Sequence, residues 1–499
     1  MYSTIVARAA QSAFIVLRYC ASTKISFLLR TAPPSLIEDA TLVHDGLVVD
    51  CLSSILDRAH PSLFDEGPFD GGAYGQASLP VRQGGLGIGS AQVTSAPAYL
   101  AGWVDFLRFH HAHPSFLPEL APCLTRDALT TSQLPDILAL RDTWSVLTSR
   151  LSRIDLVTGD LIGGEFEMQG ALGSSVSSVA DLATARAKPQ NDLFMLCMRA
   201  VERNWRKDAS TRDCVRLTEC GGKEAAWVTR CPTRPEYCMR NHLWRTAILV
   251  RLALPLPHLR KQQHGCECHD RYDCRTRHRT RKRRRPRSVD SKGEHDQRCS
   301  LTFTLGRHNE VQERALRTTL TTNDIYVSTS KVSELRDPNN EDDDSRRKGD
   351  LTATSLFHDG QTILDVGITH PTIDTYINNS SSGAARGTAA NIMAANKERK
   401  ANKIIKEKDL DIGFKAITFS SYGGFGKSAH DLITKATSGA TKYDLDPWAR
   451  PGPKTHAYLT FGFAIARANA RMLINADTKR RSARNRVRTS RPRSQTPDV

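Results

Sequence analysis

The sequence predicts a multi-domain protein in which a helical N-terminal half precedes a small C-terminal α/β domain. Three observations lead to this fold class. The chain has 499 residues, too many for one ordinary core. Apolar residues recur at near-helical intervals over 1–60, and mostly helical, polar sequence follows over 120–260. From residue 350 onward, strand-like and helix-like stretches alternate, as they do in α/β domains.

The composition limits the classes of protein to which the chain can belong. No apolar run reaches the length that a bilayer requires, so we expect a soluble chain with no membrane partner. Twelve cysteines without a secretory signal indicate a reducing compartment. Residues 1–37 lack acidic residues, as organelle transit peptides do, but "SAFIVLRYC" is more typical of a buried helix.

Two short segments carry the whole net charge. Residues 275–287 hold nine Lys/Arg and residues 479–493 hold eight, and these account for the formal charge of +17. Such local polycations suit a phosphate backbone or a nuclear-import receptor, so we expect DNA or RNA as partner, not a small molecule, and a nuclear location. The alternative is a basic linker and a frayed terminus. The expected nucleic-acid-binding residues are Arg279, Arg281, Lys282, Arg283, Arg284, Arg285, Arg480 and Arg481.

The stretch "DLTATSLFHDGQTILDVGITHP" (350–371) predicts a β-hairpin. Asp359-Gly360 is a strong two-residue turn signal, which would set Asp365 opposite Thr354. Side-chain alternation then puts Asp350 on the same face as Asp365, but about 13 Å away at about 3.3 Å per residue. A shared Mg²⁺ requires carboxylates much closer together, so either the strand bends or the turn differs.

A lysine-rich helix follows the hairpin. In "MAANKERKANKI", Met393, Lys397, Lys400 and Ile404 share one stripe at helical spacing. Lys400 is therefore expected on the inward face, with Lys403 beside it. A lysine close to two carboxylates and a metal could stabilise charge on a phosphate under attack. The alternative is a solvated Lys-rich helix.

Two glycine-rich stretches do not meet the requirements of nucleotide-binding loops. "QGGLGIG" lacks the full G-x-G-x-x-G spacing and the acidic partner of a dinucleotide site. "SYGGFGKS" lies between a strand and a helix, but Ser421 replaces the first glycine of a phosphate loop, and no apolar strand ending in Asp follows. A simple glycine turn into a helix is the favoured interpretation.

The spacing from Asp350 to Asp365, followed by lysines on the next helix, resembles the restriction-like PD-(D/E)xK endonucleases of non-LTR-type retroelements. The resemblance implies a restriction-endonuclease-like α/β domain over 301–475. It also implies Mg²⁺ held by Asp350 and Asp365, with Lys400 or Lys403 stabilising the transition state.

The segment before this domain is similar to the Cys/His knuckle that precedes that nuclease. The matching sequence, within 261–300, is "GCECHDRYDC" followed by "KGEHDQRC". The resemblance implies a zinc site whose ligands would be Cys266, Cys268, His295 and Cys299. The spacing His-x3-Cys is common in zinc sites, whereas Cys-x-Cys is unusually tight. Competing ligands are Cys274, His264 and His269.

Residues 1–260 resemble the thumb and connector that follow the catalytic palm of retroelement reverse transcriptases. The matching stretches are "LRYCASTKISFLLRTAPP", "LPVRQGGLGIGSAQVTSAPAYLAGW" and "LWRTAILVRLALPLP". The only aspartate run, Asp342–Asp344, lies in a polar loop and not in a strand context. The polymerase core is therefore expected to be missing, with no reverse transcriptase activity. Residues 476–499 are expected to form a basic, disordered tail.

Together these patterns predict a retroelement-derived, nucleic-acid-binding protein with a Mg²⁺-dependent DNA endonuclease domain. The alternative is a catalytically dead reverse-transcriptase remnant that only binds nucleic acid. The intact Asp/Asp/Lys set favours activity. Three departures favour decay: Gly349 replaces the usual proline, Gly367 occupies a frequent lysine position, and Ser420 replaces a frequent glutamate.

Overall fold

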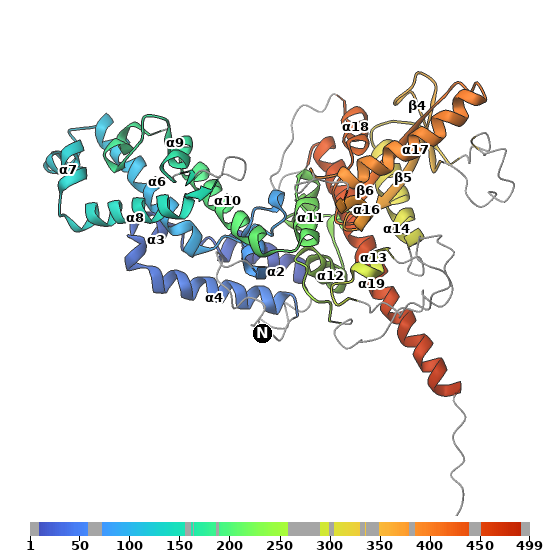
Figure 1. Cartoon of the computed structure of the whole chain (residues 1–499), viewed down its shortest axis with the longest axis horizontal. Helices are drawn as coiled ribbons and strands as arrows, with labels where there is room; N and C mark the ends of the chain where they lie inside the picture. Colours follow the sequence, from blue (N-terminus) through green and yellow to red (C-terminus); the bar gives the residue numbers. More distant parts are fainter. Residues whose placement is uncertain are drawn as a thin grey trace, which may run out of the picture. The chain divides into compact units, whose positions relative to one another are not determined.

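The chain divides into two compact units (Figure 1). The N-terminal unit comprises residues 1–80 and 85–210, and the C-terminal unit comprises 81–84 and 211–499. The sequence suggested a boundary at 260, whereas the structure groups 211–257 with the C-terminal unit. The computed structural model describes residues 9–57, 72–154, 161–162, 164–185, 189–257, 290–298, 304–329, 335, 349–378, 385–438 and 451–490.

The N-terminal unit is helical, as predicted. Ser90 caps the N-terminus of the helix that begins at Ala91. The Asp45 carboxylate supports this cap by accepting hydrogen bonds from the Ser90 hydroxyl (2.6 Å) and the Ala91 N–H (2.7 Å). The helices are α2 (Ala10–Val16), α3 (Ser26–Thr31), α4 (Glu38–Ile55), α5 (Gly72–Ser78), α6 (Ala91–Ala112), α7 (Arg126–Thr131), α8 (Pro135–Leu151), α9 (Gly164–Leu172) and α10 (Gln190–Asp208). Strands β1 (Arg153–Ile154) and β2 (Leu161–Ile162) form one short antiparallel pair.

The expectation that no stretch is long enough to cross a bilayer is wrong for Ala10–Thr31. By length and composition alone this stretch could cross a bilayer. Its mean hydropathy is 1.3, and 28% of its most apolar window is buried. Core helices of soluble proteins and N-terminal signal sequences have the same property. In the structure the stretch is not one regular α-helix, because a wider helical turn (Leu17–Ala21) and a bend separate α2 from α3.

The C-terminal unit combines helices with a four-stranded mixed sheet, the α plus α/β layout that the sequence predicted. The sheet order is β3-β4-β5-β6, antiparallel up to β5 and parallel between β5 and β6. The strands are β3 (Val327–Ser328), β4 (Leu351–Thr354), β5 (Gln361–Thr369) and β6 (Ile412–Ser420). The helices are α11 (Thr211–Glu219), α12 (Asn241–Arg251), α13 (Glu294–Arg298), α14 (Thr304–Val311), α15 (Thr318–Thr321), α16 (Asp374–Asn378), α17 (Thr388–Glu407), α18 (Lys427–Ala436) and α19 (Pro453–Ser490).

Helices cover both faces of this sheet. Helix α17, which connects β5 to β6, packs on one face and runs beside both strands (Figure 1). Its core contains Ile363, Phe414 and Ala416 from the sheet with Ala394, Ala401 and Ile404 from α17. The opposite face packs on α14, α15, α18 and α19 through Leu351, Ala353, Leu364, Val366, Ile417 and Phe419. Because side chains alternate along a strand, Asp365 and Gly367 point to the α17 face together with Ile363.

The hairpin forms, but the predicted two-residue turn at Asp359-Gly360 is wrong. Strand β4 pairs with β5 from Leu351 opposite Leu364 to Thr354 opposite Gln361. Residues 355–360 form the loop, which closes with the Ser355 N–H bonded to the Gly360 carbonyl (2.9 Å). The register therefore differs from the expected one by four residues. An even shift keeps both aspartates on one face and removes the distance of about 13 Å between them.

Gly349, immediately before β4, has a backbone conformation that only glycine adopts readily. Its φ is +100°, and an added Cβ would lie 2.4 Å from Ile363 Cγ2. Proline, with φ fixed near −65°, cannot occupy this position in the observed conformation. The proline that the resembling nucleases usually carry before the first aspartate is therefore incompatible with the backbone conformation at this position.

We expect Gly349→Ala to lower the free energy of unfolding by about 2–3 kcal/mol, since it adds a steric clash to backbone strain. Gly423→Ala is the matched control, because Gly423 has a similar φ of +98° but open space around its Cβ position. Urea unfolding should show a clearly smaller loss for the control. Equal losses would mean that the contact with Ile363 plays no part.

The C-terminal segment was expected to be a disordered tail from residue 476. In the structure α19 continues as a helix to Ser490. Its N-terminal part is well packed, with Phe461, Phe463 and Leu473 buried. The helical backbone thus extends through most of the basic segment 479–493, including Arg480 and Arg481.

Candidate active site

Asp350 and Asp365 lie next to each other on adjacent strands. Asp350 immediately precedes the Leu351–Leu364 pair, so continuing that register by one residue brings it alongside Asp365. The Asp350 N–H donates to the Leu364 carbonyl (2.8 Å), and its Oδ2 accepts the Val366 N–H (2.6 Å). Both side chains are largely shielded, 17% and 16% exposed. The structure thus brings together the two aspartates that the sequence selected.

The lysine at this acidic pair is Lys397. Its Nζ lies 2.8 Å from Asp365 Oδ2 and donates to the Val366 carbonyl at 3.0 Å. Gly367 lies beneath it: a Cβ there would be in ordinary contact with Lys397 Cε (3.5 Å) but too close to Met393 Sδ (2.8 Å). The position where the nucleases that the sequence resembles often carry their lysine is a glycine here, and a lysine from α17 reaches Asp365 instead.

Lys400 and Lys403, the lysines that the sequence selected, do not make this contact. Both are exposed, and Lys403 pairs with Glu407 on its own helix at 3.6 Å. The shared stripe of Lys397, Lys400 and Ile404 was the right signal, but about 60° of rotation about the helix axis decides which of the two lysines faces the sheet. Lys397 lies closest to the buried centre of that stripe, between Ala394 and Ala401.

His308 is a fourth member of the cluster, and sequence reasoning did not select it. It lies on α14, and its Nε2 is 3.0 Å from Asp350 Oδ2. The only sequence signal was its place in "GRHNEV", directly after the Cys/His segment, which gives no indication of a partner some forty residues later in the chain. Only the packing of α14 against β5 brings the two together.

The charges of the four clustered side chains influence the pKa values of Asp365 and His308. Burial raises the pKa of Asp365; the charge and hydrogen bond of Lys397 lower it, and the nearby Asp350 charge raises it, with a net increase. Burial lowers the pKa of His308, but its hydrogen bond to Asp350 and the charge of that carboxylate outweigh burial, so the pKa is raised. Two shielded carboxylates thus repel each other and each is bonded to a cationic or protonatable side chain.

The donor atoms fit Mg²⁺ better than zinc. Mg²⁺ usually takes one or two carboxylates and completes its octahedron with water and substrate oxygens. The two carboxylates offer oxygen ligands, and a divalent cation beside them would relieve their repulsion. Among the residues that the structure describes, no group of three or more His, Cys, Asp or Glu side chains is arranged to hold a metal. The described side chains of this cluster therefore do not form a metal site in which every ligand comes from the protein.

Most of the other predicted site residues lie outside the described part of the chain. This applies to the zinc ligands Cys266, Cys268 and Cys299 and to the arginine-rich segment 275–287. His295, the remaining zinc candidate, is buried on α13, and its backbone N–H donates to Asp290 Oδ2 (2.7 Å). Arg480 and Arg481 lie on α19, where the structure describes the backbone alone.

A buried glutamate fixes the start of α17, and so the helix that carries Lys397. Glu219 is 3% exposed, and its Oε1 accepts the N–H of Gly387, the residue that precedes α17. Beside it, the buried Glu224 pairs with Arg386 at 2.9 Å. A Cβ on Gly424 would lie only 1.7 Å from Glu219 Oε2, so this carboxylate packs directly on bare backbone.

Burial raises the pKa of Glu219 to about 7. The Ser420 hydroxyl and the Gly387 N–H lower the pKa, the Glu224 charge raises it, and Arg386 lowers it again. Burial dominates because a carboxylate removed from water loses its hydration. Protonation of Glu219 near neutral pH is therefore linked to the packing of α17.

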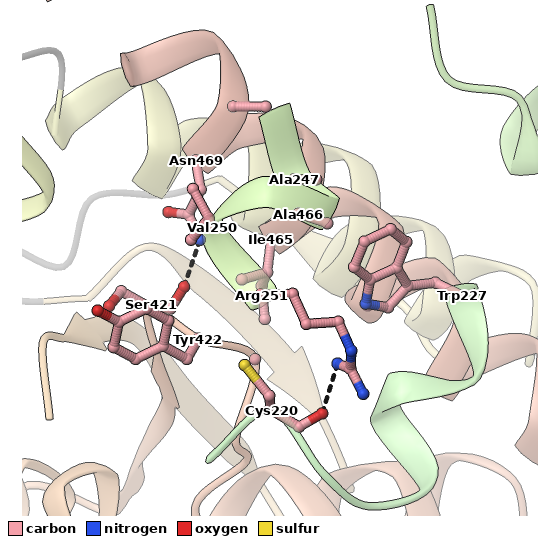
Figure 2. Close-up of a pocket in the computed structure, with 13 residues that line it drawn as sticks. Cys220, Trp227, Ala247, Val250, Arg251, Ser421, Tyr422, Ile465, Ala466 and Asn469 are labelled. Atoms are coloured by element: carbon pink, nitrogen blue, oxygen red, sulfur yellow. Dashed lines mark hydrogen bonds between the residues drawn. The ribbon is translucent and has the colours of Figure 1, made fainter. Parts of the chain in front are cut away.

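The pocket in Figure 2 is a separate feature inside the same unit. It lies between α12, α19 and the loop 421–423 and has a volume of about 30 Å³, room for one or two water molecules but not for a nucleotide. Arg251 donates to the Cys220 carbonyl (2.6 Å), and the Asn469 amide donates to the Ser421 carbonyl (Figure 2). Both bonds satisfy backbone carbonyls where helices pack together. We therefore assign these polar side chains a role in packing and not in ligand binding.

Comparison with known proteins gives no further identification: no protein-family model and no curated protein sequence matches this chain.

Proposed function

We propose that the C-terminal unit is a Mg²⁺-dependent endonuclease that hydrolyses phosphodiester bonds in DNA. One observation carries the proposal: Asp350, Asp365 and Lys397 meet at adjacent strands and the helix beside them, with Lys397 Nζ 2.8 Å from Asp365. The retroelement origin suggested by the sequence, and a nuclear location, remain part of the same proposal.

Each side chain has a distinct role in this proposal. Asp350 and Asp365 would hold Mg²⁺, which when bound polarises the phosphate and helps to activate water. The Lys397 ammonium, already held by Asp365 and the Val366 carbonyl, would stabilise negative charge that develops on the phosphate oxygens. The Val366 N–H and His308 keep the Asp350 carboxylate in a fixed orientation.

The competing function is nucleic-acid binding without cleavage. Gly349 and Ser420 still differ from the related nucleases, and decay would explain both. Gly367, in contrast, no longer argues for decay, because Lys397 brings an ammonium to Asp365 from α17 and no lysine is needed on the strand. The lysine that α17 supplies favours the enzyme over the remnant.

The test is a nicking assay on supercoiled plasmid DNA with the full chain. We expect nicking with Mg²⁺, none with EDTA, and a rate at least about 100-fold lower for Asp365→Asn, which keeps the side-chain volume but removes a charged ligand. Glu407→Gln, an exposed acid on α17, is the matched control and should nick normally. Binding without nicking would support the remnant, and equal nicking by Asp365→Asn would exclude this site.

A further inference from the structure

One flank of α17 faces the edge strand of the sheet. Glu398 Oε1 accepts the Ala416 N–H (3.3 Å) and pairs with Lys415 (3.1 Å), and both partners belong to β6. In the described sheet β6 is the last strand beside β5. The Glu398 flank is therefore occupied by contacts with the sheet.

The opposite flank lies on the side of β5 and β4, where the candidate active site lies. Asn396, Lys400 and Lys403 follow the i, i+4, i+7 spacing of one helix face and are all exposed. At 100° per residue this face is nearly opposite Glu398, with Lys397 between the two flanks. Because Lys397 reaches Asp365, Lys400 is the next lysine along the helix from the reactive centre.

This flank carries positive charge that the protein does not neutralise. Within the described part of the chain, Lys400 has no acidic partner. Arg399 bonds to the Asn396 amide oxygen at 2.9 Å and so leans toward the same flank. Only Lys403 is paired, with the exposed Glu407, and such a surface pair is worth little.

We propose that the flank formed by Asn396, Arg399, Lys400 and Lys403 is the track on which the phosphate backbone of the nucleic-acid substrate lies. The inference rests on the proposed nuclease function and gives the substrate a path. Lys400 and Lys403 lie about 4.5 and 9 Å along the helix axis from Lys397. With about 3.4 Å per nucleotide along a strand, they would contact phosphates one to three nucleotides from the cleaved bond.

The chemistry of the flank also predicts the kind of recognition. Its cationic groups are flexible and lack an aromatic neighbour among themselves, so they suit phosphates and not base edges. Binding here should be independent of sequence and sensitive to salt. Lys400 and Lys403, first selected as catalytic residues, thus receive a role in substrate binding.

The test compares Lys400→Ala with Lys427→Ala, an exposed lysine on α18, the helix that packs on the opposite face of the sheet. Affinity for a duplex DNA of arbitrary sequence is measured in EDTA across a series of salt concentrations, so that no cleavage occurs. We expect Lys400→Ala to reduce the slope of log K against log salt by about 0.9, and Lys427→Ala to leave it unchanged. In the nicking assay, Lys400→Ala should raise KM without lowering kcat.

The outcomes separate this inference from the proposed function. Loss of slope in Lys400→Ala without any nicking by the wild type would support the track and overturn the nuclease. Nicking by the wild type with identical slopes and KM values in both variants would support the nuclease and overturn the track. Matching thermal unfolding of the two variants shows that neither is misfolded.

Discussion

Lys397→Ala should reduce the nicking rate by about 100- to 1,000-fold, the usual loss when one preorganised group that stabilises charge is removed from an active site. Lys397 is the only lysine in the described structure that contacts the acidic pair, and it is held by both Asp365 and the Val366 carbonyl. Lys400→Ala and Lys403→Ala, which remove neighbouring charges on the same helix, should keep kcat close to that of the wild type.

A second variant distinguishes a role in the reaction from a role in folding. Gly367 lies two residues after Asp365 on the same face, and Lys397 passes over its bare Cα. A lysine introduced there, in Gly367→Lys combined with Lys397→Ala, should restore part of the lost rate, about 10-fold, by supplying the ammonium from the strand. Met393 must move to admit it, because its sulfur lies 2.8 Å from the new Cβ.

Full activity in Lys397→Ala would contradict the assigned role directly. Failure of the rescue alone, with a folded double variant, would mean that the ammonium must approach from α17. Binding of DNA in EDTA should be nearly the same in the wild type, in Lys397→Ala and in the double variant, since one shielded lysine among many exposed cations changes overall affinity little. A rate loss without a binding loss is the signature of a group that acts in the transition state.

The strands and helices of the C-terminal unit were the most predictable part of this protein. The alternation around Asp365 separated the two faces of β5, and the stripe of Met393, Lys397, Lys400 and Ile404 indicated roughly which side of α17 faces the sheet. Both patterns are local, so short windows of sequence contain them. The site pair followed from the same alternation, because parity survives any even change in register.

Contacts between distant segments were not predictable in the same way. The six-residue loop 355–360 could not be distinguished from a tight turn, since Asp-Gly satisfies the rules for both. His308 reaches the site, and Glu219 reaches the start of α17, through packing of α14 and α11 against residues more than forty positions away. The choice between Lys397 and Lys400 depended on about 60° of helix rotation, which a stripe of apolar residues does not fix.

The stability of the protein should depend on pH through Glu219, which holds the start of the helix that carries Lys397. Its pKa is raised to about 7 in the folded protein from an ordinary value of 4.5. Between these values the unfolded chain is ionised while the folded protein keeps the proton, so the free energy of unfolding falls as pH rises. The loss should reach about 3 kcal/mol above pH 7 and be absent below pH 4.5.

Glu219→Gln should remove this loss, since an amide keeps an acceptor for the Gly387 N–H but carries no charge. We expect the variant to be more stable than the wild type at pH 8 by up to about 3 kcal/mol and to match it near pH 4.5. Urea unfolding at several pH values measures the difference, with Glu407→Gln as the exposed control. A constant difference between variant and wild type across pH 5–8 would show that Glu219 does not titrate there, and that Gly387 and α17 are held without a proton.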